Sequence, residues 1–349
     1  MADFVRTLRY PFETPPAEGE VIEVASGILW ARLPLPMALD HVNVYILDGD
    51  DGWTIVDTGF VSRRTRAIWQ KLLDGPLVGK PVARVLVTHH HPDHVGLAGW
   101  FMADHGAELL MSRTAWLTAR MLTLDEQAVP PPETLEFWKS AGMSVETLAK
   151  RASERPFNFA EAVAPLPLGY RRVQGETELA LGGRNWFVRT GNGHAPEHLT
   201  LWSDDGDVVL AGDQIIPSIS PNIGVYATEP EADPVTEWLE SCERLRSFAD
   251  PRQLVLPGHK LPFVGAETRL DQLIQNHHGA LRRLEAFLVE PHTAADCFRT
   301  LFKRDIVGGE YGLALVEAMA HCVHLWHAGR VTRTRRDDGA WLWQTRGDV

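Results

Sequence analysis

The chain has 349 residues, of which 44% are hydrophobic and 23% are charged, a composition typical of a globular protein long enough to bury a large core. Its formal net charge of -12 disfavours unassisted binding to nucleic acid or to an anionic membrane surface. No apolar run approaches the ~20 residues that span a bilayer, no secretory signal is visible at residues 1–6, and three scattered cysteines do not suggest a disulfide framework, so we expect a soluble cytoplasmic protein.

The first part of the chain predicts strands and then an alternation of helix and strand. Residues 42–47 and 53–57 are apolar and flank an Asp/Gly-rich turn, which indicates a hairpin. Residues 63–73 have the apolar spacing of a helix. A β-branched run at 85–87 predicts a buried strand, and 95–105 predicts a helix with a proline near its start.

Between that strand and that helix lies an unusual cluster of histidines with one aspartate. On an extended backbone residues two apart point the same way, so His89 and His91 can converge on one cation while His90 points elsewhere. Where the chain bends into the helix, Asp93 and His94 can face a second cation. Four such donors in a buried turn are costly to desolvate unless something uses them, so we favour a metal site over a structural role.

The middle of the chain predicts an insertion followed by short strands. Residues 114–167 are rich in aromatics and broken by Pro130–Pro132. We interpret them as a helical cap over the metal site, although a surface helix pair that buries its own aromatics is the alternative. A helix at 234–248 follows the next strands. Strands are predicted at 177–181, 186–190, 199–202, 208–211 and 253–256. This pattern predicts an α/β fold in which helices enclose two sheets, an αββα four-layer sandwich.

From residue 265 the pattern becomes helical, so we expect one domain at 1–264 and a second at 265–349. The periodicity predicts helices at 270–288 and 311–327, and residues 331–344 predict a hairpin. Three helices and a hairpin resemble a winged-helix module. Nucleic-acid binding is not expected, because the presumed recognition helix has neither Lys nor Arg. A wing built from Arg330, Arg333, Arg335 and Arg336 would more often be a solvated or dimer-contacting edge.

The histidine cluster resembles the signature of the metallo-β-lactamase-fold hydrolases, and this resemblance covers most of the chain. Further pieces of the family pattern follow in the family's order, each at the end of a strand-like run. They are Asp57 in Ile-Val-Asp-Thr-Gly, His194 in Gly-Asn-Gly-His-Ala-Pro-Glu-His, Asp213 in Leu-Ala-Gly-Asp and His259 in Leu-Pro-Gly-His. Some relatives also carry a winged-helix-like module at the C-terminus.

The resemblance implies a centre of two divalent metal ions with a water-derived hydroxide between them. The first ion would be held by His89, His91 and His194, the second by Asp93, His94 and His259, and both by Asp213. The absence of a thiolate suits Zn²⁺, which we expect, with Mn²⁺ or Fe²⁺ as alternatives. Asp93 could also orient the water and carry its proton. Asp57 could accept a hydrogen bond from a ligand imidazole, with turn capping as the alternative. For His41 and His198 we expect structural roles.

The predicted activity is hydrolysis, in which a metal-bound hydroxide attacks the acyl carbonyl of a small thioester, ester or lactone. The apolar stretch 215–226 and the insertion would form the substrate wall, and Tyr226 could donate to the oxyanion unless it is simply packed there. The family's lactonases commonly carry a tyrosine where residues 214–216 stand, which weakens that reading. Lys260 and Arg269 are candidates for the basic residues that glyoxalase II-type enzymes use. The alternatives are a phosphodiesterase or nuclease on the same fold, or a non-catalytic metal-binding interaction protein. A homodimer remains open.

Overall fold

The computed structural model describes residues 7–347. Residues 1–6, where no secretory signal was expected, and residues 348–349 lie outside the described part. The chain divides into two compact units, each built from three separate stretches. The first unit contains Met1–Glu126, Asn158–Pro221 and Arg244–Leu270, and the second contains Gln127–Phe157, Asn222–Glu243 and Asp271–Val349.

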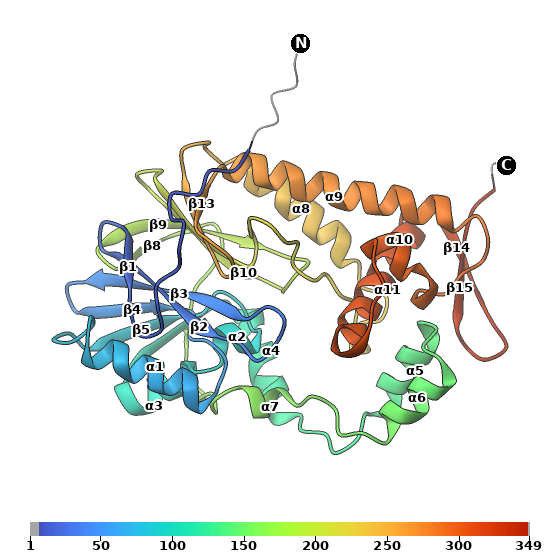
Figure 1. The fold of residues 1–349 in the computed structure, drawn as a ribbon, viewed down its shortest axis with the longest axis horizontal. Coiled ribbons are helices and arrows are strands. Elements are labelled where there is room, and N and C mark those ends of the chain that lie inside the picture. The colour runs from blue at the N-terminus through green and yellow to red at the C-terminus, as the bar shows by residue number, and fades with distance from the viewer. Residues whose placement is uncertain (1–6, 348–349) are drawn as a thin grey trace, which may run out of the picture. The chain divides into compact units, whose positions relative to one another are not determined.

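The first unit contains a seven-stranded sheet in the order β1-β2-β3-β4-β5-β6-β7 (Figure 1). Its strands are β1 (Ile22–Ala25), β2 (Ile28–Pro34), β3 (His41–Gly49), β4 (Gly52–Val56), β5 (Val82–Leu86), β6 (Glu108–Met111) and β7 (Arg171–Arg172). Strands β1 to β4 pair antiparallel and β4 to β7 pair parallel. Parallel neighbours need crossover connections, and helices supply them here.

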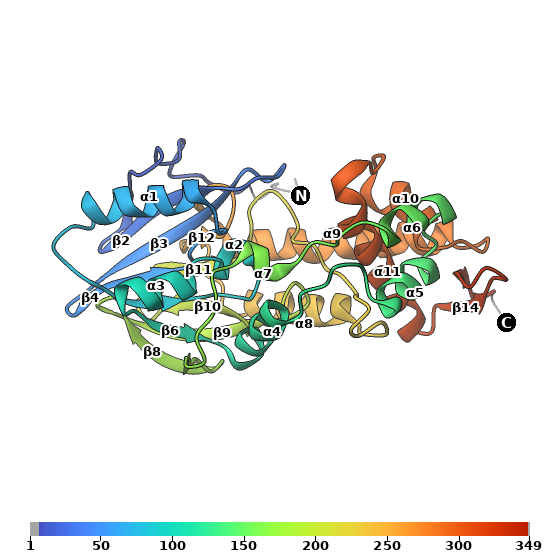
Figure 2. The same cartoon turned by 90° about the horizontal axis from the view of Figure 1, so that it is seen from below.

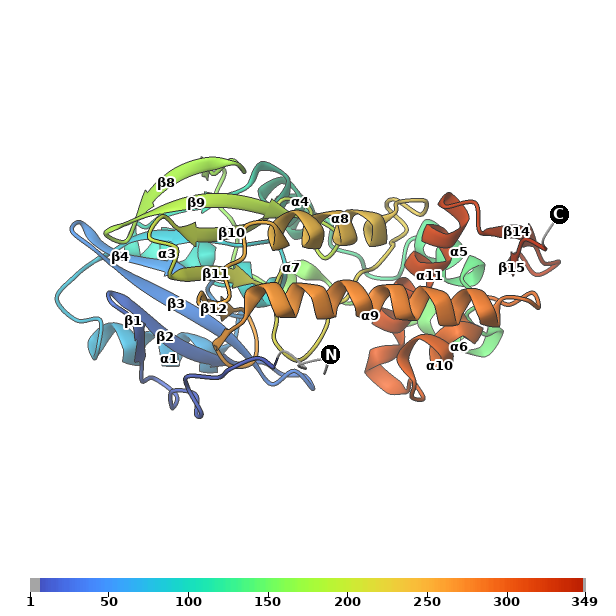
Figure 3. The same ribbon diagram turned by 90° about the horizontal axis from the view of Figure 1, so that it is seen from above.

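The second sheet has six strands in the order β13-β12-β11-β10-β9-β8, and Figure 3 shows these strands packed over the first sheet. They are β8 (Thr177–Leu181), β9 (Arg184–Gly191), β10 (His198–Ser203), β11 (Val208–Gly212), β12 (Leu254–Pro257) and β13 (Phe263–Val264). Only β11 and β12 pair parallel; the other neighbours are antiparallel.

The first unit's crossover helices connect consecutive parallel strands of the first sheet along the chain. They are α1 (Arg63–Asp74), α2 (Pro92–Val95), α3 (Ala98–His105), α4 (Arg113–Leu124) and α7 (Phe159–Ala162). Helix α1 begins at Ser62, whose side chain accepts a hydrogen bond from the Thr65 N–H. Figure 2 shows α1 and α3 along one face of the first sheet.

Alternation along β3 explains the layers. Tyr45 and Leu47 belong to a core cluster that also contains residues of the second sheet, whereas Val44 and Ile46 belong to a cluster on the opposite face. Successive side chains of a strand point to opposite faces, so the continuous apolar run Val44–Leu47 must be covered on both sides. The predicted sandwich is thereby confirmed.

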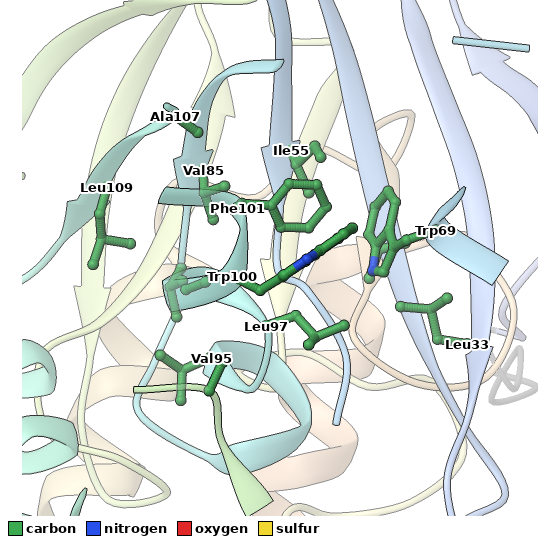
Figure 4. Close-up of a cluster of buried hydrophobic side chains, with 14 of the residues drawn as sticks. Leu33, Ile55, Trp69, Val85, Val95, Leu97, Trp100, Phe101, Ala107 and Leu109 are labelled. Atoms are coloured by element: carbon green, nitrogen blue, oxygen red, sulfur yellow. The ribbon is translucent and has the colours of Figure 1, made fainter. Parts of the chain in front are cut away.

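The outer cluster joins the first sheet to its helices (Figure 4). Trp69 of α1 and Phe101 of α3 are fully buried and meet edge to face, with ring centroids 4.9 Å apart. The indole N–H of Trp69 donates to the Thr58 carbonyl at 2.8 Å. This packing fixes the loop after β4 and the helices after β5, which carry the candidate site.

The single helix expected at 95–105 is wrong in one respect, because the structure contains two helices with a break between them. Gly96 lies so close to Gly59 and Pro92 that a Cβ there would come within 2.3 Å and 2.4 Å of their carbonyl oxygens. The Leu97 N–H donates to the Thr58 hydroxyl at 2.9 Å instead of to a helix carbonyl. A tertiary contact thus ends α2 after one turn and allows α3 to begin in a new direction.

The second unit is mainly helical and ends in a hairpin. Its elements are α5 (Pro132–Ser140), α6 (Val145–Ala152), most of α8 (Pro234–Arg246) and of α9 (Ala266–Phe287), α10 (Phe298–Phe302), α11 (Tyr311–His327), β14 (Val331–Arg335) and β15 (Trp341–Thr345). The helices and hairpin predicted for the C-terminal region are present. None of the helices in the described part of the chain combines the length and apolar character needed to cross a membrane.

The insertion is divided between the two units. Residues 127–157 join the second unit, where the Ala295 N–H donates to the Ala141 carbonyl at 3.0 Å. Gly142 approaches Thr293 so closely that a Cβ would come within 2.3 Å of its hydroxyl. The division therefore differs from the boundary we expected at residue 264, and the cap over the metal site stays a prediction.

The four arginines of the predicted basic wing are paired with carboxylates of the same unit. The pairs are Arg330 with Glu285, Arg333 with Glu231, Arg335 with Glu136 and Arg336 with Asp338. The Arg333 guanidinium also lies over Trp326 and Trp341, with Cζ 3.7 Å and 4.5 Å from the ring centroids. The wing therefore holds its positive charge against carboxylates and indole faces.

A buried histidine makes the second unit sensitive to acid. His277 is 2% exposed, neither of its ring nitrogens has a hydrogen-bond partner in the described structure, and its ring stacks on His321. Burial, reinforced by His321, lowers the pKa of His277 to about 3. Because this value lies below the unfolded value of about 6.5, the unfolded chain takes up the proton first, and stability present above about pH 6.5 falls as the pH decreases.

We expect His277→Leu to reduce this loss. Between about pH 7.5 and about pH 5 the wild type should lose about 2 kcal/mol through His277, or about 4–8 °C in melting temperature, and the variant should not. Thermal melts at both pH values measure the difference. His278→Leu, at the half-buried neighbour, is the control. An equal acid-induced loss in wild type and His277→Leu would contradict the prediction.

Candidate metal centre

The histidine cluster follows β5, and a buried aspartate at the end of β4 holds its start. Asp57 is 2% exposed and has a positive φ of 60°. Its Oδ1 accepts a hydrogen bond from the Thr88 main-chain N–H at 2.8 Å, and its Oδ2 accepts one from the Thr88 hydroxyl at 2.8 Å. Since β4 and β5 are parallel, their carboxyl ends meet at the same edge of the sheet, where α/β folds place ligands.

Three histidines form the first group of converging nitrogens. One ring nitrogen from each of His89, His91 and His194 lies within 4.8 Å of the other two. His89 Nε2 and His91 Nδ1 approach to 3.0 Å. His194 follows β9 of the second sheet, so the two sheets contribute to one group.

Asp93, His94 and His259 form the second group, again with all ligand atoms within 4.8 Å. Asp93 Oδ2 lies 3.5 Å from His94 Nε2 and 3.3 Å from His259 Nε2. His259 follows β12, while Asp93 and His94 belong to α2. Pro92 is the first residue of α2, where its fixed φ suits the start of a helix.

Asp213 lies between the two groups, directly after β11. Its Oδ1 is 3.5 Å from His94 Nε2, and its Oδ2 is 3.5 Å from His194 Nε2 and 3.2 Å from His259 Nε2. One carboxylate therefore faces nitrogens of both groups. This is the arrangement expected of a bridging ligand.

The second ring nitrogen of several histidines is held by the protein. His94 Nδ1 donates to Asp57 Oδ2 at 2.8 Å, and His259 Nδ1 donates to the His41 carbonyl at 2.7 Å. His89 Nδ1 lies 3.0 Å from the Thr88 hydroxyl. These contacts orient the Nε2 atoms toward the centre, as the surroundings of metal-binding histidines usually do. Asp57 thus contacts a candidate ligand in the way the sequence suggested.

The residues present fit a pair of divalent cations. Nε2 of His94 and Oδ1 of Asp213 are buried and make no hydrogen bond within the described part of the chain. Burial, together with His94 and His194 respectively, holds the pKa values of His89 and His91 well below their usual range, so both rings are neutral. A donor set of imidazoles and carboxylates without thiolates suits zinc, manganese or iron.

Comparison with known families agrees with this geometry. A family model described as the metallo-beta-lactamase superfamily matches residues 37–259, which include all the residues of both groups. The chain belongs to the metallo-β-lactamase superfamily. A second model, for a metallo-beta-lactamase-like C-terminal domain, matches residues 281–346.

Individual relatives place the chain among the superfamily's metallo-hydrolases. The probable metallo-hydrolase YqjP of Bacillus subtilis is 24% identical over 300 residues, which cover 84% of this chain and 90% of that protein. A linear primary-alkylsulfatase of Pseudomonas is 26% identical over 234 residues, 64% of this chain but only 42% of the relative. The crystal structure of a β-lactamase domain protein from Burkholderia ambifaria superposes with a TM-score of 0.90 at 36% identity, covering 97% of this chain and 98% of the other.

Asn43 has a role at the site that the sequence analysis missed. Its Nδ2 donates to the carbonyls of Pro257 and Lys260 at 2.9 Å and 2.8 Å, and its Oδ1 accepts from the Trp30 indole at 3.0 Å. This amide links β3 of the first sheet to the loop that carries His259. The only sequence signal is a polar residue inside an apolar strand, and the two carbonyls that it contacts lie more than 200 residues away.

Two other predicted residues, Tyr226 and Arg269, belong to neither group. Tyr226 is 48% exposed and belongs to the second unit, so its substrate role stays a prediction. Arg269 is 9% exposed and donates to the carbonyls of Ile216 and Ile219 at 2.5 Å and 2.8 Å. Arg269 therefore holds the segment that follows Asp213 in place, and its guanidinium is not free to bind a substrate.

Proposed function

We propose that this protein is a dinuclear metal-dependent hydrolase that cleaves a small molecule at an acyl carbonyl, as a thioesterase, esterase or lactonase does. The observation that carries the proposal is the pair of three-residue groups with the Asp213 carboxylate facing both of them. Two bound divalent cations, which we expect to be Zn²⁺, would supply Lewis acidity and a nucleophilic water at neutral pH.

The residues of the site divide the work. His89, His91 and His194 would hold one ion, His94 and His259 the other, and Asp213 both. Asp93, with Oδ2 3.3 Å from His259 Nε2, would complete the second site, and we propose that it also receives a proton from the water. This transfer requires a water molecule within hydrogen-bond distance of Asp93 Oδ2. Asp93 is therefore the general base that we test.

An acyl substrate is supported by the contacts of the arginine side chains. Phosphate and sulfate esters are usually anchored by free guanidinium or ammonium groups. Here Arg269 is engaged by two carbonyls, and the C-terminal arginines are paired with carboxylates. The expected apolar wall is itself largely packed inside, because Ile215 and Ile216 are 0% and 1% exposed. The proposed preference for an acyl substrate therefore rests on the engagement of these arginines by other protein groups, and not on an apolar wall.

A sulfate ester is the second candidate. It is favoured by the similarity to a linear primary-alkylsulfatase, which covers 64% of this chain. Lys260, which directly follows His259 and is half-buried, is the basic residue nearest in sequence to a candidate ligand. A nuclease and a non-catalytic metal-binding protein are weaker candidates, because the wing arginines are paired and both groups of ligands are complete.

A substrate panel distinguishes these candidates. Protein loaded separately with zinc, manganese and iron should be assayed against thioesters, lactones, aryl esters, a linear alkyl sulfate and phosphodiesters. We expect turnover of one of the acyl classes, abolished by chelation and restored by metal. Preferential turnover of the alkyl sulfate would replace the acyl proposal with the second candidate. Absence of turnover by protein that holds two metal equivalents would favour a binding protein.

A further inference from the structure

A histidine outside both groups contacts two candidate ligands, one that follows a strand of each sheet. His198, the first residue of β10, is fully buried. Its Nε2 accepts a hydrogen bond from the Asp213 main-chain N–H at 3.0 Å. Its ring stacks on that of His89, with centroids 4.5 Å apart and an interplanar angle of 24°. From the sequence alone we expected only a structural role for His198.

The turn before Asp213 is shaped around this ring. Gly212 has a positive φ of 48°, and a Cβ at this position would come within 2.6 Å of His198 Cε1 and 2.8 Å of His198 Nε2. The imidazole therefore occupies the space beneath the turn, and glycine is the residue that permits the close approach. The position of Asp213 depends directly on the position of the ring.

The hydrogen bond also defines the state of the imidazole. Because Nε2 accepts a proton, a neutral ring carries its own proton on Nδ1, which is buried without a hydrogen-bond partner in the described structure. A buried donor without a partner is unfavourable by about 1–3 kcal/mol. A phenylalanine would fill the same space without this penalty, so the acceptor on Nε2 is the property that distinguishes histidine here.

We propose that His198 is a positioning residue for the dinuclear centre. Its Nε2 fixes the Asp213 main chain, and with it the carboxylate that faces both groups. This inference rests on the proposed function, since it concerns how tightly the two ions are held. The competing view is that His198 only fills space beneath the turn.

Matched substitutions separate the two views. His198→Phe keeps a flat ring of similar volume and removes the acceptor. His198→Gln removes the ring and carries an amide oxygen that can reach the position of Nε2. If the acceptor matters, His198→Phe should bind metal about 10–100-fold more weakly, and His198→Gln should recover most of the affinity. His277→Leu, a buried histidine in the other unit, should leave metal affinity unchanged.

Metal affinity should be measured by competition with a chromophoric chelator, and ligand geometry by the visible absorption of the cobalt-substituted proteins. Melting of the metal-free proteins reports whether each variant folds. We expect an altered cobalt spectrum for His198→Phe and a spectrum close to wild type for His198→Gln. A folded His198→Phe with wild-type affinity and spectrum would overturn the inference. If His198→Phe does not fold, His198→Gln decides: near-wild-type affinity supports the inference, and a tenfold or greater loss overturns it.

The wild-type protein in the same titration tests the proposed function separately. If the wild type takes up two ions and His198→Phe binds them equally well, only the proposed role of His198 is contradicted. Uptake of fewer than two ions by wild type removes the dinuclear centre, and the positioning role with it.

Discussion

Replacing Asp93 with alanine is expected to lower kcat by about 10²–10⁴-fold, the usual contribution of a positioned acid–base group. Asp93 Oδ2 lies 3.5 Å from His94 Nε2 and 3.3 Å from His259 Nε2, so it reaches the centre while the rest of the residue sits in α2. The first-turn position is partly exposed, and we expect the variant to fold. Initial rates on the best substrate of the panel give the effect.

The variant must be compared with a surface control and with its own metal content. Asp104→Ala removes an exposed carboxylate from α3 and should leave kcat unchanged. A loss of one metal equivalent in Asp93→Ala would show that its ligand role dominates, whereas a full complement of metal with low kcat would show the proton-transfer role. An Asp93→Ala protein with both wild-type kcat and two metal equivalents would exclude either role.

Removal of metal is expected to lower the melting temperature of the protein markedly as well as its activity. A ligand that binds only the folded state adds about 4 kcal/mol when its free concentration is about 1,000 times its Kd. For a unit of about 150–250 residues this corresponds to roughly 8–16 °C per ion. Each group joins residues from both sheets, so each ion would resist separation of the sandwich.

Calorimetry before and after dialysis against a chelator measures this stabilisation, and re-addition of zinc should restore it. Magnesium, which prefers oxygen ligands, is the control that should restore little. Equal melting temperatures with and without the chelator, in protein shown to have lost its metal, would mean that the two groups do not bind cations as proposed.

The ligand groups could be anticipated because their signal is local. His89, His91, Asp93 and His94 lie within six residues, and the remaining candidates each follow an apolar run that forms a strand. A strand end fixes where its next residue lies, so the sandwich follows from the same pattern. The structure brings all seven candidate ligands together without using any further motif.

Apart from Asp57, the residues that support the site could not be anticipated, because their partners are distant in sequence or depend on the path of a turn. Asn43 bonds Pro257 and Lys260, and His198 bonds a main-chain N–H whose direction depends on the Gly212 turn. The break between α2 and α3 likewise depends on a hydroxyl from another loop. Periodicity describes one segment at a time, and each of these features joins two.

The composition of the second unit from three stretches has a consequence for how the protein is made. Residues 127–157 and 222–243 leave the ribosome before 271–349, with which they share a core. The first unit has its last stretch, including His259, before that final region emerges. During synthesis the first unit can therefore be completed before the second. Until residues 271–349 emerge, the two earlier stretches lack their packing partners, and apolar side chains that are buried in the finished protein, such as Phe137, stay exposed to aggregation.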